Sequence, residues 1–199
     1  MEQRTEGWYT ARVGKITASR IKDLSAKPKA GKCLNDTLTK ILAERLSGEP
    51  TPTAKNKAMD WGIQCEPLAR QAYELATFCT VVEVGLIDHP SIPMSGASPD
   101  GLVGDDGLIE IKCPETATHT NTLLTGQVPN DYLPQIAWQL ACTGRDWCDF
   151  VSFDPRMPSH LQIKIIRINR SDVDIEALER DVMRANEILT QAIKELNHE

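Results

Sequence analysis

The candidate catalytic side chains lie in one short stretch, residues 98–112, which reads SPDGLVGDDGLIEIK. Asp100 stands in a Pro-Asp-Gly turn, and Glu110 and Lys112 alternate with apolar residues further along the stretch. Successive side chains of a strand point to opposite faces, so Glu110 and Lys112 share one face. If the turn folds Asp100 back onto that face, two carboxylates and one amine converge. Such a cluster predicts a divalent-metal site with a cation beside it, as phosphodiester hydrolysis requires.

A Glu-x-Lys triplet has a second interpretation, an ion pair on the solvated face of a strand. Three features favour the metal site instead. Pro99 and Gly101 fix the backbone on either side of Asp100 through turn chemistry. The strand is otherwise apolar, so an unpaired charge within it would be costly. Pro114 ends the strand immediately, which places the charged pair at the end of a sheet.

Length and composition are those of a globular protein. The chain has 199 residues, of which 41% are hydrophobic and 25% are charged, and we expect one domain over residues 1–199. No apolar run approaches the roughly eighteen residues of a membrane span, and the first fifteen residues lack the apolar core of a signal peptide. We therefore expect a cytoplasmic protein with no membrane partner. The six cysteines show no zinc-binding spacing and are expected to be reduced.

The charges are unevenly distributed along the chain. The net charge of −6 by itself argues against nucleic acid as a partner. However, residues 4–57 contain twelve Lys or Arg against five Asp or Glu, whereas residues 171–199 contain three against eight. A local basic channel in an acidic protein is compatible with DNA binding at one place, and two solvated helix faces explain the charges equally well.

The N-terminal segment precedes this stretch and carries further polar candidates. Residues 4–24 read as a helix that Gly14 interrupts, followed by a second helix capped by Thr17 or Ser19. The basic loop AKPKAGK, residues 26–32, comes next. It is either a solvated linker or a loop that contacts phosphates, and the sequence leaves both interpretations open.

Two amphipathic helices are predicted before the first strands, over residues 34–46 and 58–77. Pro67 is expected to kink the second helix or to start a new one. Glu66, directly before it, is either a surface residue or an acid aimed at the metal site.

The second half of the chain alternates between strand and helix patterns. A helix is predicted over 132–143, with Gln135 and Gln139 on one face, and another over 173–196, whereas the Thr-rich segment 116–126 reads as a loop. Strands are predicted over 80–87, 94–97, 108–113, 147–153 and 161–168. This order predicts an α/β protein with α+β-like order, built on a central mixed sheet of about five strands flanked by helices.

The Pro-Asp motif and Glu110-Ile111-Lys112 resemble the PD-(D/E)xK nuclease superfamily, and within it the phage lambda exonuclease family of alkaline exonucleases and viral recombinases. The resemblance implies a restriction-endonuclease-like sheet and covers roughly residues 4–168. Further segments that resemble the family are RVGKITAS (12–19), AKPKAGK (26–32), WGIQCE (61–66), DYLPQIAWQ (131–139) and DPRM (154–157).

The resemblance implies a role for each matching residue at the cleavage site. Asp100, Glu110 and the backbone carbonyl of Ile111 are expected to bind Mg²⁺ or Mn²⁺, with two ions per site. Lys112 is expected to orient or activate the attacking water, and Glu66 to hold the water or a second metal through water. Gln135 is expected to lie beside Lys112 or the water.

The same resemblance implies a binding site for the 5′-phosphate of DNA, made by Arg12 and Ser19 with Thr17 and Ser98 as further candidates. The chain departs from the family at two points. The second Gln of the family's helix motif is replaced by Ala137, with Gln139 two residues later, so the role of Gln139 stays open. Asp88 aligns only loosely with a family acid, and its role also stays open.

The function implied is a metal-dependent 5′→3′ exonuclease acting on linear double-stranded DNA. It would release 5′-mononucleotides and leave 3′ overhangs for a single-strand annealing protein. The family resembled forms a ring-shaped homotrimer, and we expect the same here. Two alternatives are a sequence- or structure-specific endonuclease of the same superfamily and a DNA-end-binding protein without catalytic activity.

Overall fold

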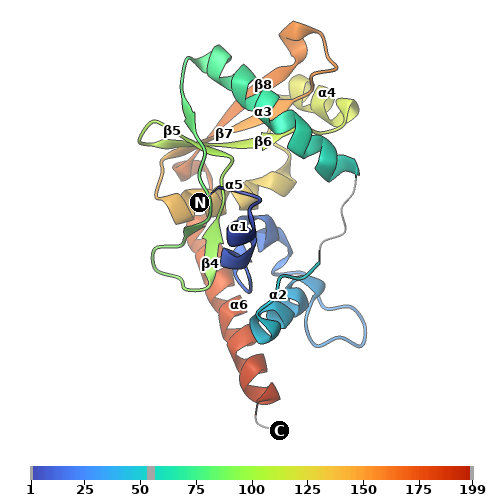
Figure 1. The fold of residues 1–199 in the computed structure, drawn as a ribbon, viewed down its shortest axis with the longest axis vertical. Coiled ribbons are helices and arrows are strands. Elements are labelled where there is room, and N and C mark those ends of the chain that lie inside the picture. The colour runs from blue at the N-terminus through green and yellow to red at the C-terminus, as the bar shows by residue number, and fades with distance from the viewer. Residues whose placement is uncertain (1, 53–56, 198–199) are drawn as a thin grey trace.

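A five-stranded mixed sheet forms the upper part of the computed structural model, which describes residues 2–52 and 57–197 (Figure 1). The strand order is β2-β5-β6-β7-β8. The β6–β7 pair is parallel, and the other pairs are antiparallel. The expected mixed sheet of about five strands is therefore confirmed. Its strands are β2 (Val81–Val82), β5 (Gly101–Val103), β6 (Gly107–Lys112), β7 (Trp147–Phe153) and β8 (Ile163–Asn169).

Helices cover both faces of this sheet because the side chains of β6 alternate between two apolar clusters. Ile109 and Ile111 pack with Tyr73 of α3 (Lys57–Thr77) on one face. Leu108 packs on the opposite face with Ile136 and other residues of α5 (Leu133–Thr143). Glu110 belongs to the α5 face by the two-residue period of a strand. The sheet is thus sandwiched between α3 and α5 (Figure 1).

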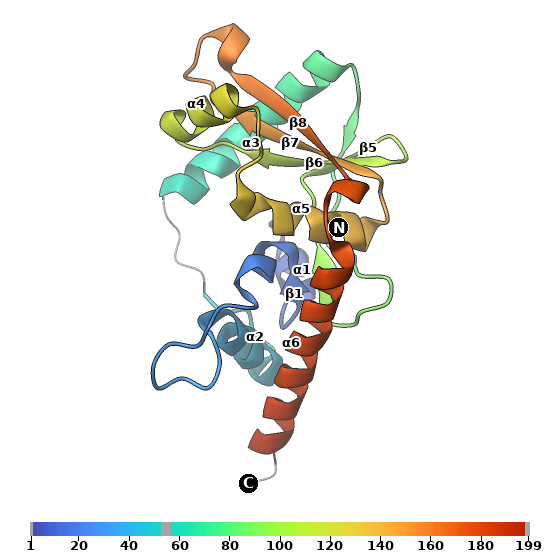
Figure 2. The ribbon, with the colours of Figure 1, turned by 180° about the vertical axis from the view of Figure 1, so that it is seen from behind.

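The far side of α5 packs against a second apolar core in the lower half of the molecule (Figure 2). Trp138 and Cys142 of α5 contribute to it, and Val182 and Leu189 come from the long helix α6 (Ile175–Leu196). The apolar stripe expected in the C-terminal helix therefore faces this core. The other elements in this half are α1 (Glu6–Ala11), α2 (Asp36–Ser47), the 3₁₀ helix η1 (Ala18–Asp23) and the small sheet β1-β4-β3, with β1 (Ile16–Thr17), β3 (Ile87–Asp88) and β4 (Ser95–Ala97).

Several local predictions are wrong. The Thr-rich segment is not a loop but helix α4 (Thr116–Thr125), in which threonine hydroxyls bond backbone carbonyls one turn earlier. The single strand predicted over 80–87 is two short strands, β2 and β3, which belong to different sheets. The predicted second N-terminal helix is η1, preceded by the two-residue strand β1. Of the two alternatives expected at Pro67, a kink or a new helix, the new helix is wrong, because α3 continues through Pro67. Three further 3₁₀ turns are η2 (Asn130–Tyr132), η3 (Ser159–Leu161) and η4 (Arg170–Asp172).

Among the described residues, no helix combines the length and apolar character that a membrane crossing requires.

Candidate active site

Glu110 lies between β6 and α5 and accepts hydrogen bonds on both of its carboxylate oxygens. Its side chain is only 1% exposed. One oxygen, Oε1, accepts hydrogen bonds from Gln135 Nε2 at 2.6 Å and from Lys112 Nζ. The other oxygen, Oε2, accepts from Gln139 Nε2 at 2.5 Å. The two glutamines are one helical turn apart, so α5 presents both amides to the same strand residue.

Asp100 approaches Glu110 because β5 and β6 are adjacent antiparallel strands. The backbone N–H of Asp100 donates to Ile109 O, and the N–H of Ile111 donates to Asp100 Oδ2 at 2.6 Å. Asp100 keeps partial access to solvent but is densely surrounded by protein atoms. Burial, followed by the negative charge of Glu110, raises the pKa of Asp100 well above its usual value. The two carboxylates are therefore close enough to repel each other.

Lys112 projects from the same face of β6 as Glu110, as the alternation predicted. Burial disfavours its ammonium, but the carboxylates of Glu110 and Asp100 outweigh this effect and raise the pKa of Lys112 above its usual value. The Lys112 Nζ also lies 5.2 Å from the ring centroid of Tyr132, whose ring stacks on Phe150. Lys112 is thus held as a cation in a fixed position beside the acidic pair.

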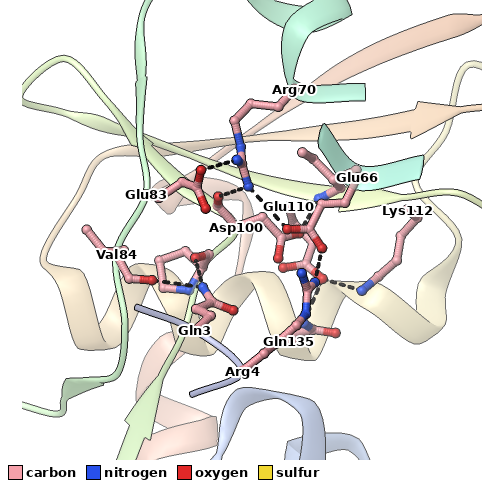
Figure 3. Close-up of polar contacts among 12 residues, drawn as sticks. Gln3, Arg4, Glu66, Arg70, Glu83, Val84, Asp100, Glu110, Lys112 and Gln135 are labelled. Carbon is pink, nitrogen blue, oxygen red and sulfur yellow. Dashed lines mark hydrogen bonds and ion pairs between the residues drawn. The ribbon is translucent and has the colours of Figure 1, made fainter. Parts of the chain in front are cut away.

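Glu66 reaches the same cluster from helix α3, and its charge contributes to the raised pKa of Asp100. It pairs with Arg4 and with Arg70, the latter at 3.1 Å. Arg70 also pairs with Glu83. Figure 3 shows these groups gathered around Asp100 and Glu110. The sequence left open whether Glu66 is a surface residue or faces the proposed metal site. Its side chain points toward the acidic cluster.

The donor set fits a hard divalent cation. Asp100 and Glu110 supply two carboxylates, and their mutual repulsion favours a cation between them. Among the described residues, no three His, Cys, Asp or Glu side chains form a metal cage by themselves. A site with two carboxylates can bind a hard divalent cation when water and substrate phosphate supply the other ligands. Carbonyl oxygens, such as that of Ile111, are ligands of the same hard class.

A second polar cluster surrounds Arg12, which follows directly after α1. Arg12 Nη1 donates to Ser98 Oγ at 3.2 Å and Nη2 donates to Thr17 Oγ1 at 3.3 Å. Ser19 Oγ lies 3.4 Å from Thr17 Oγ1. The structure therefore brings together all four residues expected at the 5′-phosphate site. Trp8, which the sequence did not single out, lies 4.2 Å below the Arg12 guanidinium and donates to Ser98 Oγ at 3.0 Å.

The turn that carries Arg12 is fixed by the buried carboxylate of Glu44. Glu44 accepts from the backbone N–H of Gly14 at 2.9 Å and from Arg20 at 2.6 and 2.8 Å. Gly14 has φ +68°, and a Cβ there would lie 2.7 Å from the Arg45 side chain, so the turn requires glycine.

Arg12 itself lies in a positively charged environment. Burial, followed by the charge of Arg20, lowers the pKa of Arg12 to about 10, although Glu44 partly opposes this. Arg12 is still a cation at neutral pH. Two arginines close together favour the binding of an anion beside them.

Both clusters line one open cleft of about 900 Å³. Asp100, Glu110, Lys112, Glu66 and Gln135 line it together with Arg12, Ser19 and Ser98. Ser98 and Asp100 are separated only by Pro99, which is roughly 7 Å of extended chain at most.

The structure also places the features whose roles the sequence left open, which are Asp88, the basic loop and Gln139. Asp88 pairs with Lys15 at 2.5 Å and does not line the cleft. In the basic loop, Lys29 and Lys32 both pair with Asp36. Gln139, whose role the sequence left open, contacts Glu110 directly.

Among the cleft residues that the sequence reasoning missed, four lie beside the two clusters, and a signal was present for one of them. Trp8 precedes Arg12 by four residues, a spacing that places two side chains on one helix face. The remaining three are Arg4, Tyr132 and Arg20.

Comparison with family models matches residues 7–146 to the YqaJ-like viral recombinase domain. The chain belongs to this family. The expected lambda-exonuclease-like relationship is therefore confirmed. No curated protein matches the sequence.

Solved structures agree with this assignment. A structure of LHK-Exo in complex with dAMP is 45% identical, with 98% of this chain and 97% of that chain covered and a TM-score of 0.90. A second structure, of the alkaline exonuclease LHK-Exo from Laribacter hongkongensis, has the same identity and coverage and a TM-score of 0.89. A phage-related exonuclease from Haemophilus somnus 129PT, at 17% identity, covers 92% of this chain and 96% of that one with a TM-score of 0.68, and it shares the fold.

Proposed function

We propose that this protein is a metal-dependent 5′→3′ exonuclease that degrades one strand of linear double-stranded DNA to 5′-mononucleotides. The whole chain, residues 1–199, would form one nuclease domain. Family membership and the similarity to alkaline exonucleases support the coarser statement that the chain is a DNA exonuclease. The polarity and the products are inferred from its cleft.

One observation carries the polarity: the Arg12 cluster and the acidic cluster share a cleft and are linked through Ser98 and Asp100. A planar guanidinium flanked by hydroxyl groups suits a terminal phosphate, which offers several oxygens to a forked donor. Ser98 contacts Arg12, and Asp100, two residues later, belongs to the acidic cluster. The two clusters are therefore neighbours within one cleft. A 5′-phosphate held at Arg12 would therefore place the next phosphodiester bond at the acidic cluster.

The acidic cluster would bind Mg²⁺ or Mn²⁺, with two ions per site as the proposal. Asp100 and Glu110 would be the ligands, with the carbonyl of Ile111 completing the set. When bound, such ions lower the pKa of a coordinated water and neutralise charge on the scissile phosphate. Divalent-metal dependence is general for nucleases of this family, whereas the identity and number of the ions belong to the proposal.

The remaining residues would position the reactants. Lys112, held as a cation beside Glu110, would stabilise the negative charge that develops on the phosphate and orient the attacking water. Glu66 would accept a hydrogen bond from that water or hold a second ion through water. Gln135 and Gln139 fix the orientation of the Glu110 carboxylate through their amide groups.

The proposed assembly is a homotrimer around DNA, with a single-strand annealing protein as partner for the exposed 3′ strand. Support comes from the excess of Lys and Arg in residues 4–57 within a chain of net charge −6. A ring with a basic channel and an acidic exterior would retain one duplex and repel others.

The test compares linear with covalently closed circular duplex DNA of the same sequence in Mg²⁺. We expect release of 5′-mononucleotides from the linear form only, beginning at the 5′ end of each strand. Glu110→Gln, which removes a ligand charge at nearly constant volume, serves as the inactive control. Cleavage of the circle would favour the endonuclease, and tight binding to linear ends without release under any metal would favour the non-catalytic protein.

A further inference from the structure

Arg4 extends into the active-site cleft from the N-terminal segment and carries no role in the function proposed above. Its side chain lines the cleft and pairs with Glu66 Oε2 (Figure 3). Arg4 is therefore a further cation at the acidic cluster, besides Lys112 and Arg70. Arg4 and Lys112 contact different carboxylates, since Lys112 pairs with Glu110.

The backbone at Arg4 is held in an unfavourable conformation. Its φ is +64°, in the left-handed region that residues with a Cβ rarely adopt. Such a conformation persists only where the surroundings constrain it.

The neighbouring residues supply that constraint. The Gln3 side-chain amide donates to Val84 O at 2.9 Å and to Pro99 O at 2.8 Å. Pro99 directly precedes Asp100, so this contact attaches the N-terminal segment to the turn that carries a metal ligand. On the other side, Thr5 Oγ1 accepts from Trp8 N at 3.3 Å at the start of α1. The backbone is thus fixed on both sides of Arg4.

The ion pair between Arg4 and Glu66 is suited to exchange. The Arg4 side chain is 39% exposed, so solvent reaches this end of the pair, whereas Glu66 is 15% exposed. Glu66 has a second partner in Arg70, whose side chain is only 13% exposed. Glu66 would therefore stay paired if Arg4 turned toward another anion.

We propose that Arg4 contacts the phosphate at the cleavage site, and that its pair with Glu66 is the position it occupies before substrate arrives. This inference rests on the nuclease function proposed above. The guanidinium has five N–H donors in a plane, so it can bond a phosphate oxygen while another N–H still faces Glu66. Arg4, which lies beside Glu66, and Lys112, which lies beside Glu110, would then both contact the reacting phosphate.

The test uses the full chain with Arg4→Gln and Arg4→Lys, and with Arg180→Gln on the outer face of α6 as a matched control. Single-turnover release of the first nucleotide is measured on 5′-phosphorylated linear duplex. We expect Arg4→Gln to slow release about 10- to 100-fold, as for a lost hydrogen bond to a charged group, and Arg4→Lys to recover part of the rate. Arg180→Gln should cleave at the wild-type rate. An Arg4→Gln variant as fast as wild type would overturn the inference.

A second measurement separates contact with phosphate from support of Glu66. Mn²⁺ binding to the DNA-free protein is titrated for wild type and Arg4→Gln. If Arg4 acts on the phosphate, removing it leaves Mn²⁺ affinity unchanged or tightens it, because a competing cation is gone. Weaker Mn²⁺ binding in proportion to the lost rate would show that Arg4 only positions Glu66, and would overturn the inference.

The preference for 5′-phosphate over 5′-hydroxyl ends provides a third readout. This preference should be the same in Arg4→Gln as in wild type, because Arg12 is the residue proposed to bind the terminal 5′-phosphate. A lost preference would place Arg4 at the terminal phosphate instead and contradict the inference. If the wild-type protein released no nucleotide, the proposed function itself would fail, which is a different result from equal rates in wild type and variant.

Discussion

At the scale of single residues, Glu110 shows how the cleft is organised before substrate binds. Its carboxylate is almost fully buried, and nitrogen groups from Lys112, Gln135 and Gln139 reach both of its oxygens. A buried charge without such partners would be strongly destabilising. The hydrogen bonds therefore allow this carboxylate, the proposed metal ligand, to lie inside the protein in one orientation.

We propose that recognition of the DNA end depends on Arg12. Arg12→Ala removes the guanidinium that contacts Ser98 and Thr17. We expect the preference for 5′-phosphorylated over 5′-hydroxyl duplex ends to fall about 10- to 100-fold, the size of a lost charge-assisted contact. Initial rates on both substrates measure it, with the exposed Arg184→Ala as a control. An equal loss of rate on both substrates would contradict this role.

At the scale of elements, α5 connects the two halves of the molecule. One face contributes Ile136 and Leu140 to the core under the sheet, and the other contributes Trp138 and Cys142 to the core with α2 and α6. Because the helix is fixed on both sides, its glutamines keep their position relative to β6.

The end of β7 is joined to α4 through Asp154, which accepts a hydrogen bond from Thr116 Oγ1 at 2.6 Å.

The contacts of Asp154 predict how stability depends on pH. Burial opposes ionisation, but hydrogen bonds from Arg156 and Thr116 outweigh it and lower the pKa of Asp154 to about 2, from a usual 3.8. A carboxyl whose pKa is lowered by folding stabilises the protein above its unfolded pKa, and this contribution is lost as the pH falls through the folded pKa.

We therefore expect Asp154→Asn to lower the free energy of unfolding by about 1–3 kcal/mol at pH 5 and above, the cost of losing hydrogen bonds to a charged group. The difference from wild type should shrink between about pH 4 and pH 2. Urea denaturation across this range measures it, and the exposed Asp105→Asn is the control. A difference that does not change with pH would contradict the ionic origin of the effect.

At the scale of the whole molecule, the uneven charge distribution fits a ring with DNA inside. Sedimentation velocity is expected to give a particle of three times the mass of one chain, in which the segment 4–57 contributes to a basic channel. The rate of nucleotide release from long duplex DNA should then fall steeply as salt is added, because contacts with phosphates release counterions. A protein that sediments as a monomer at all concentrations tested would exclude the ring.

Much of the fold could be predicted because local patterns determine it. The apolar stripe of α6 and the alternation along β6 both follow from the geometry of the chain. Helix α4 was missed because its threonines read as a loop, although their hydroxyls bond the helix's own carbonyls. The division of residues 80–88 between two sheets was missed because strand pairing depends on distant partners.

The sequence alone singled out the candidate residues for this chemistry: the carboxylates Asp100 and Glu110, the amine of Lys112 and the arginine Arg12. Their types and spacing follow from local chemistry and from family resemblance. Only the tertiary structure decided that Glu66 turns toward them, that Gln139 bonds Glu110, and that Arg4 enters the cleft. The physical reason is that these contacts join residues far apart in sequence, and their positions depend on how α3, α5 and the N-terminal segment pack against the sheet.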